Sequence, residues 1–95
     1  MENQFAGSSR ISIYASDTNN VLIRLLQLFG KSRFEVSYIQ VFNTQDPDLK
    51  LIMLEALFPK EMMPLIISRI EKIIEVHRAF PHLQEDTNPF ATRNG

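Results

Sequence analysis

Apolar and polar residues in the first third of the chain follow the period of a strand and then the period of a helix. Residues 10–15, RISIYA, alternate Ile11 and Ile13 with more polar neighbours, a pattern typical of a half-buried strand. From Val21 the apolar residues recur at helical spacing and stop at Gly30, which suits the left-handed end of a helix. The pattern therefore predicts a strand followed by a helix.

The rest of the chain predicts a hairpin, a second helix and a last strand. Residues 34–43 and 49–58 are rich in β-branched and aromatic side chains, and the breaker Gln-Asp-Pro-Asp lies between them. Isoleucines gather on one face of residues 60–75, where Pro64 is early enough to fit the first helical turn. Residues 76–80 then predict a short strand that ends at a proline.

The predicted order of elements is β-α-β-β-α-β. This order is typical of an α+β, ferredoxin-like sandwich, in which two helices pack on one face of a four-stranded antiparallel sheet. We expect one folded domain over 10–83, because a chain of 95 residues is the size of a single domain. The segments 1–9 and 84–95 contain few apolar residues, so we expect both to be flexible.

The two strands of the predicted hairpin carry apolar residues on both faces. One face covers the helices, and the other would meet water unless a second chain covered it. A chain this short gains stability from extra burial, so we predict a homodimer. The residues assigned to the dimer interface are Ile39, Val41, Ile52, Leu54 and Phe58.

Composition and charge exclude several classes of function. With 10 Lys and Arg against 11 Asp and Glu, the formal charge of −1 provides no basic surface for nucleic acid. The absence of cysteine excludes disulfides, thiolate nucleophiles and Cys-ligated zinc. The first residues lack the pattern of a secretion signal, and the apolar stretch LIMLEALF is too short to cross a bilayer. We therefore expect a soluble, cytoplasmic protein with no membrane partner.

Patterns that indicate catalysis or metal binding are missing from the sequence. His77 and His82 do not share a helical face, and no nucleophile, base and orienting group occur together. We therefore expect a protein that is not an enzyme and that needs no cofactor or metal. An RNA-binding or catalytic domain of this fold class remains a minor alternative, since the fold alone does not determine function.

The polar turn from Ser16 to Asn20, between the first strand and the first helix, leaves two interpretations open. Backbone N–H groups at a helix N-terminus can bind a carboxylate or a phosphate, and the same residues can simply cap the helix. We expect the side chain of Asp17, Thr18 or Asn19 to cap it.

From Arg10 to Phe80 the chain resembles an ACT domain, and specifically the N-terminal domain of the small subunit of acetolactate synthase (acetohydroxyacid synthase). The segments that carry this resemblance are LIRLLQLFGKSRFEVSYIQV, TQDPDLKLIML and IEKIIEVHRA. The hairpin TQDPDL, residues 44–49, is the most specific of them.

The resemblance implies a regulatory subunit that binds and activates a thiamine-diphosphate-dependent catalytic large subunit in branched-chain amino acid synthesis. Many members of that family transmit inhibition by valine. ACT domains commonly pair side by side, which agrees with a homodimer, and this chain looks like the short, single-domain form of the subunit. A stand-alone ACT domain that senses an amino acid or binds another protein is the alternative.

The resemblance also implies where an amino acid would bind. Family members that sense one place an Asn at the start of the first loop, a Gly just before the first helix and a second Asn at the start of the second strand. The matching positions here are Asp17, Asn20 and Glu35, so three positions depart together, and we expect branched-chain amino acids to bind weakly or not at all. The candidate ligand-binding residues are Asp17, Asn19, Asn20, Val21, Leu22, Glu35 and Val36.

Overall fold

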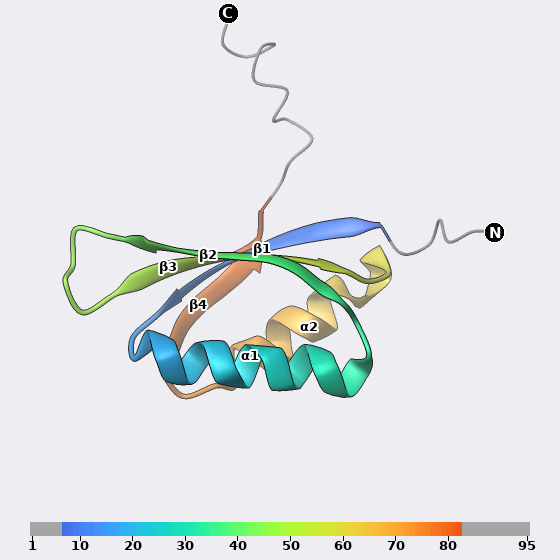
Figure 1. Ribbon diagram of the computed structural model, residues 1–95, viewed down its shortest axis with the longest axis horizontal. Helices are drawn as coiled ribbons and strands as arrows, with labels where there is room; N and C mark the ends of the chain where they lie inside the picture. Colours follow the sequence, from blue (N-terminus) through green and yellow to red (C-terminus); the bar gives the residue numbers. More distant parts are fainter. Residues whose placement is uncertain (1–6, 83–95) are drawn as a thin grey trace, which may run out of the picture.

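The computed structural model describes residues 7–82, in which four strands and two helices follow the predicted order (Figure 1). Their bounds are β1 Ser8–Ala15, α1 Thr18–Ser32, β2 Val36–Asn43, β3 Lys50–Leu57, the short 3₁₀ turn η1 Lys60–Met62, α2 Met63–Ile70 and β4 Val76–Pro81. The segments predicted to be flexible, 1–9 and 84–95, lie outside the described residues apart from residues 7–9. Ser8 and Ser9 belong to β1 and pair with β3, so the strand begins two residues earlier than predicted.

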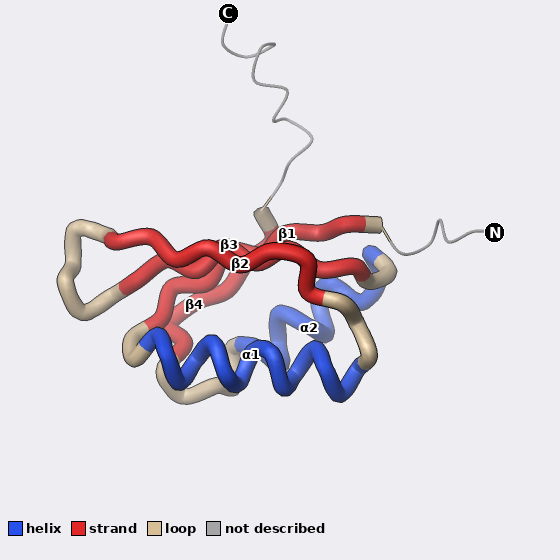
Figure 2. Tube along the Cα trace, viewed as in Figure 1, coloured by secondary structure: helices blue, strands red, loops and turns tan. Residues whose placement is uncertain are grey.

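The strands form one antiparallel sheet in the order β2-β3-β1-β4, and both helices cover the same face of it (Figures 1 and 2). The predicted α+β, ferredoxin-like arrangement is confirmed. The hydrophobic core lies between the sheet and the helices, where alternate residues of β1 and β3 meet residues of α1 and α2 at helical spacing. The largest fully buried side chains are Phe29, Phe58, Ile11, Ile13, Leu25, Ile52, Leu54, Ile66, Ile70 and Val21.

Helix α1 continues past the predicted end at Gly30 and closes with a Schellman motif. Arg33 has a left-handed backbone (φ 61°, ψ 32°), and its N–H donates to the Gly30 carbonyl at 3.0 Å. The Phe34 N–H donates to the Phe29 carbonyl, also at 3.0 Å. The rings of Phe29 and Phe34 both lie against Phe58, with centroids 6.1 and 5.8 Å from its ring. The predicted stop at Gly30 was wrong, because the helix ends where Phe34 can return to the core.

Helix α2 is shorter than predicted, although Pro64 lies in its first turn as expected. After Ile70 the backbone hydrogen bonds join residues three apart: Ile73 donates to Ile70, and Val76 donates to Ile73, each at 3.0 Å. These tight turns carry the chain directly into β4 instead of continuing the helix to Glu75.

The residues predicted for a dimer interface share the helix-covered face of the sheet. Ile39 and Val41 pair with Leu54 and Ile52, and directly paired residues of antiparallel strands point to the same side. Ile52, Leu54 and Phe58 are fully buried in the core, so assigning them to a surface for a second chain was wrong. Ile39 and Val41 stay partly accessible because β2 is an edge strand.

A register shift in β2 also moves one residue to the other face. The pairing with β3 is irregular between Val36 and Tyr38, which is the effect of a β-bulge. Val36 therefore pairs with Ala56 on the core side, whereas strict alternation would put it on the same face as Tyr38.

The two edges of the sheet differ in how their backbone groups are used. On β4, the Ala79 N–H donates to the Glu71 carboxylate at 3.0 Å, and His82 donates inward to the Arg10 carbonyl at 2.9 Å. Because neighbouring residues of a strand point their N–H groups to opposite sides, Pro81 stands where the next outward N–H would be. On β2, no outward backbone group has a partner within residues 7–82.

Candidate functional site

The turn before α1 is held by backbone contacts. Asp17 has a left-handed backbone (φ 43°, ψ 61°), and its carbonyl accepts a hydrogen bond from the Val21 N–H at 3.1 Å. The helix has no side-chain cap bond, so the expectation that Asp17, Thr18 or Asn19 caps it was wrong. A capping side chain normally stands on an extended backbone, which Asp17 does not have.

The same turn is tied to the segment between α2 and β4. The Ser16 N–H donates to the Glu75 carbonyl at 3.0 Å, and the Ser16 hydroxyl lies 3.4 Å from the same oxygen. In the Glu75 side chain, Oε1 is buried and has no hydrogen-bond partner in the described part of the chain. The turn therefore has a fixed position relative to β4.

The candidate ligand-binding residues fall into two groups at opposite ends of α1. Asp17 to Leu22 lie at its N-terminus, whereas Glu35 and Val36 follow its C-terminus (Figure 1). A helix of 15 residues is about 22 Å long at 1.5 Å per residue. A single copy of the chain therefore does not bring the two groups together.

The residues of the first group differ in accessibility. Asp17 and Asn19 are exposed, Asn20 and Leu22 are half-buried, and Val21 is fully buried in the core. Asn20 lies inside the helix, and the left-handed residue of the turn is Asp17. Asn20 is thus under no backbone strain, and Val21 has a packing role.

Helix α1 has two different flanks beside its buried stripe. At 100° per residue, Ile23 and Leu26 lie on the flank that faces away from α2, and they are 57% and 51% exposed. Arg24 and Lys31 lie on the flank toward α2. We call these the apolar flank and the cationic flank. The apolar stripe of this helix in the sequence is wider than the face one helix can bury, and that width could have revealed the apolar flank.

The face of the sheet away from the helices carries one ion pair and several aromatic rings. Arg10 Nε lies 3.0 Å from Glu55 Oε1, and the Ser8 hydroxyl also donates to the Glu55 carboxylate. Hydrogen bonds from Ser8 and Arg10, together with the charge of Arg10, hold the pKa of Glu55 below its ordinary value. The Arg10 guanidinium lies 5.7 Å from the centre of the Tyr38 ring, and on β1 and β4 the rings of Tyr14 and Phe80 are 6.1 Å apart.

The two histidines do not come together with other ligating or catalytic groups. His77 is exposed, and His82 Nδ1 lies 3.4 Å from the Ser12 hydroxyl. Within residues 7–82, no three His, Cys, Asp or Glu side chains are placed to hold a metal ion. In the same range, no helix has the length and apolar character needed to span a membrane.

Comparison with known protein families gives a match to the ACT domain over residues 17–79, which is more than half of the chain. The chain belongs to the ACT domain family. ACT domains are regulatory modules and not catalytic ones. A comparison with curated proteins finds no match.

Solved structures similar to this ACT domain come from three different protein contexts. The C-terminal domain of the MgtC protein from Mycobacterium tuberculosis is 9% identical, with a TM-score of 0.70, over 86% of this chain and 92% of that one. The ACT domain of GTP pyrophosphokinase from Chlorobium tepidum is 14% identical, with a TM-score of 0.64, over 81% of this chain and 99% of that one.

The third structure is the acetolactate synthase small subunit from Thermotoga maritima. It is 20% identical, with a TM-score of 0.69, over 79% of this chain but only 47% of that one. This chain thus spans about half of that small subunit and shares its fold over that part.

The hairpin over residues 44–49 carries the most specific part of the family resemblance. Hydrogen bonds of its own side chains hold its turn. The Thr44 hydroxyl lies 2.8 Å from the Leu49 carbonyl and accepts the Asp46 N–H at 3.0 Å, while the Asp46 carboxylate accepts the Asp48 N–H at 2.9 Å. These residues therefore determine the turn between β2 and β3.

Proposed function

We propose that this ACT domain is a non-catalytic regulatory subunit that binds and activates the catalytic large subunit of acetolactate synthase, in the cytoplasm. The observation that carries the proposal is the likeness to the Thermotoga maritima small subunit, together with the sequence segments that resemble that family. In this proposal, the catalytic large subunit carries out acetolactate synthesis and this chain regulates it.

We also infer that the chain acts as a homodimer that pairs through β2 and the apolar flank of α1. Ile23 and Leu26 leave large apolar surfaces in water, and Val41 on β2 is 39% exposed. The outward backbone groups of β2 have no partner within residues 7–82, and an unpaired edge strand can bind a second strand. This pairing replaces the interface first assigned to the fully buried Ile52, Leu54 and Phe58.

Such a dimer would complete the candidate ligand site. Two-fold pairing of β2 with its copy runs the two α1 helices in opposite directions. Asp17 and Asn20 of one copy would then approach Glu35 and Val36 of the other. The carboxylates of Asp17 and Glu35 would meet at this site, which disfavours the carboxylate of an amino acid. We therefore propose that valine sensing is weak or lost.

Sedimentation velocity at micromolar concentrations tests the dimer. Leu26→Glu should produce monomers because it places a charge in the proposed interface, whereas Gln27→Glu adds the same charge on the opposite flank and should leave the dimer intact. A wild-type protein that stays monomeric as its concentration rises would contradict this dimer.

The regulatory role is tested by mixing the chain with a cognate catalytic subunit and measuring acetolactate formation. We expect a higher rate and co-purification of the two proteins. Unchanged rates without co-purification would contradict the proposal.

A stand-alone ACT domain that senses a small molecule or binds another protein is the second candidate. The observation in its favour is that two of the similar structures, the MgtC domain and the GTP pyrophosphokinase ACT domain, come from proteins other than acetolactate synthase. Saturable amino acid binding by a chain that leaves acetolactate formation unchanged would favour this candidate.

A further inference from the structure

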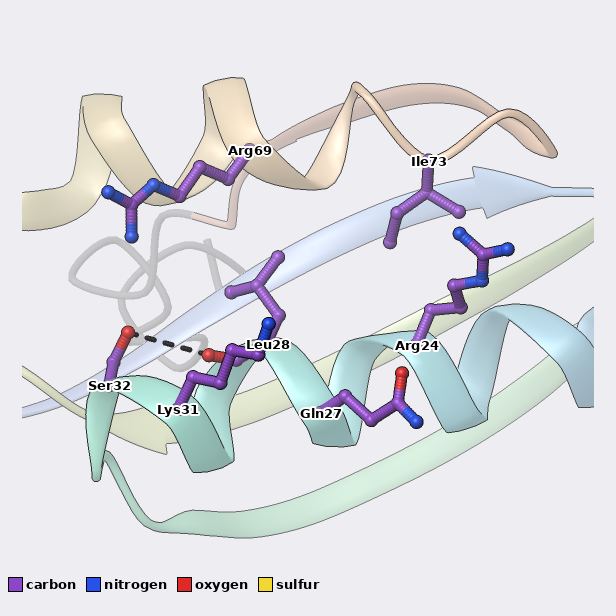
Figure 3. Close-up of a pocket in the computed structure, with 7 residues that line it drawn as sticks. All are labelled: Arg24, Gln27, Leu28, Lys31, Ser32, Arg69 and Ile73. Atoms are coloured by element: carbon purple, nitrogen blue, oxygen red, sulfur yellow. Dashed lines mark hydrogen bonds between the residues drawn. The ribbon is translucent and has the colours of Figure 1, made fainter.

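The cationic flank of α1 lines a groove between the two helices. The groove has a volume of about 260 Å³, and Arg24, Gln27 and Lys31 of α1 line it together with Arg69 of α2. Figure 3 shows the three positively charged side chains projecting into the space between the helices. Leu28 and Ile73 add an apolar part to the lining of the groove.

The positive charge of this groove is not balanced within the described part of the chain. Neither α1 nor α2 contains an Asp or Glu. The one ion pair found within residues 7–82 joins Arg10 to Glu55, so none of the three groove cations has an acidic partner there. Glu71, just after α2, directs its carboxylate to the Ala79 N–H of β4.

This asymmetry is notable in a protein whose formal charge is −1. Within residues 7–82, the acidic side chains lie in the hairpin, in the turns and on the open face of the sheet, and the cations of the two helices line one groove. Like charges that share a groove repel one another, and an anion bound between them removes that repulsion.

We propose that this groove binds a small phosphate monoester. Guanidinium groups bind phosphate oxygens through paired hydrogen bonds, and the groove offers two of them, beside an ammonium group and a side-chain amide. Three cations match a dianion better than the single charge of a carboxylate. The volume of about 260 Å³ lies just below the usual range for small-molecule sites, which suits a small ligand, and the apolar lining accommodates a short carbon skeleton.

The site is distinct from the turn at Asp17 and does not depend on an acetolactate synthase partner. It is formed within one copy of the chain, on the flank of α1 opposite to the proposed dimer contact. A dimer through β2 would therefore carry two such grooves.

Amide chemical-shift titration of the full chain tests the proposal, with glycerol phosphate as the probe and sodium chloride used to hold ionic strength constant. Residues of α1 and α2 around the groove should shift in a saturable way, with a millimolar dissociation constant. Glycerol alone should cause no shift, and inorganic phosphate should bind because it presents the same oxygens.

The deciding variant is Arg24→Gln combined with Arg69→Gln, and it should weaken binding about tenfold or more. The matched control is Lys60→Gln combined with Lys72→Gln, which removes the same charge from outside the groove and should change binding less than about twofold. The amide spectrum away from the groove reports whether each variant stays folded. Absence of saturable shifts, or equal weakening in both pairs, would overturn the proposal.

Discussion

The two ends of α1 both use a left-handed residue, but only one end is locked by side-chain packing. At the C-terminus, Arg33 closes a Schellman motif, and the aromatic rings of Phe29, Phe34 and Phe58 pack around it. At the N-terminus, Asp17 is exposed and no side chain caps the helix. The C-terminal end therefore depends on burial, whereas the N-terminal end depends on backbone hydrogen bonds and on its tie to Glu75.

This difference between the two ends indicates which positions can be substituted without unfolding the domain. At an end that is anchored in the core, a substitution alters the packing of the core, because protein interiors are close-packed. An end that is held by backbone contacts leaves its exposed side chains free to vary, and Asp17 and Asn19 are the exposed candidate ligand residues at that end.

The largest expected effect on stability comes from removing one of the aromatic rings that pack at the C-terminal end of α1. Phe29→Ala should lower the free energy of unfolding by about 3–5 kcal/mol, because it removes a fully buried ring and leaves a cavity. Asn19→Ala, at the other end of the helix, should change it by less than about 0.5 kcal/mol. Urea unfolding measures both, and similar losses at the two ends would break the comparison.

The next effect concerns the left-handed residues themselves. Arg33→Gly should raise the free energy of unfolding by about 0.5–1 kcal/mol, because glycine adopts this conformation without strain. Asp17→Gly should gain less, since Asp tolerates the left-handed region better than Arg does. Thermal melts of the two variants give the order, and a larger gain at Asp17 would reverse it.

A third prediction concerns amino acid binding at the N-terminal end of α1. The triple variant Asp17→Asn, Asn20→Gly and Glu35→Asn restores the residue types of amino acid sensors and should bind valine at least about tenfold more tightly than the wild type. Calorimetry up to millimolar valine measures both proteins. A wild-type dissociation constant near 10 μM, about −7 kcal/mol, would show instead that the substitutions do not impair sensing.

The smallest expected effect is a pH dependence of the free energy of unfolding. It tests whether the difference in stability between the two ends of α1 comes from packing or from charge. Glu55 lies on the opposite face of the sheet from both ends, and its pKa is lowered by Ser8 and Arg10. A carboxyl whose pKa is lowered in the folded state stabilises the fold above its unfolded pKa, and this contribution is lost as pH falls through the folded pKa. Wild-type stability should therefore fall below an ordinary carboxyl pKa of 4.5, and Glu55→Gln should fall less. The gap between Phe29→Ala and Asn19→Ala should stay constant over this range.

The order of elements could be predicted from the sequence because strand and helix periods are local signals. Pro64 in the first turn of α2 and the breaker before Leu49 could be predicted for the same reason, since each is a signal within one short segment. The bulge after Val36 and the burial of Phe58 were not, because they depend on the face to which two distant segments bring their side chains. Alternation alone identifies two faces and does not say which of them meets the helices.

The candidate site was less predictable for the same reason. The sequence placed Asp17 and Glu35 in one site by resemblance, whereas the fold separates them by the length of α1. The grouping of Arg24 and Lys31 with Arg69 depends on how two helices pack, which no single helical pattern contains.

The blocked edge of the sheet limits how many copies of this chain can join. A protein with two open sheet edges can add copies at both, and head-to-tail addition extends into fibres. On β4, the Ala79 N–H is bound to the Glu71 carboxylate and Pro81 has no N–H, so two outward positions there cannot donate to an added strand. Within residues 7–82, β2 is the edge whose outward backbone groups have no partner, and the proposed dimer would join two copies by that edge. In the proposed dimer, this asymmetry of the two edges would favour a closed pair and disfavour filament growth.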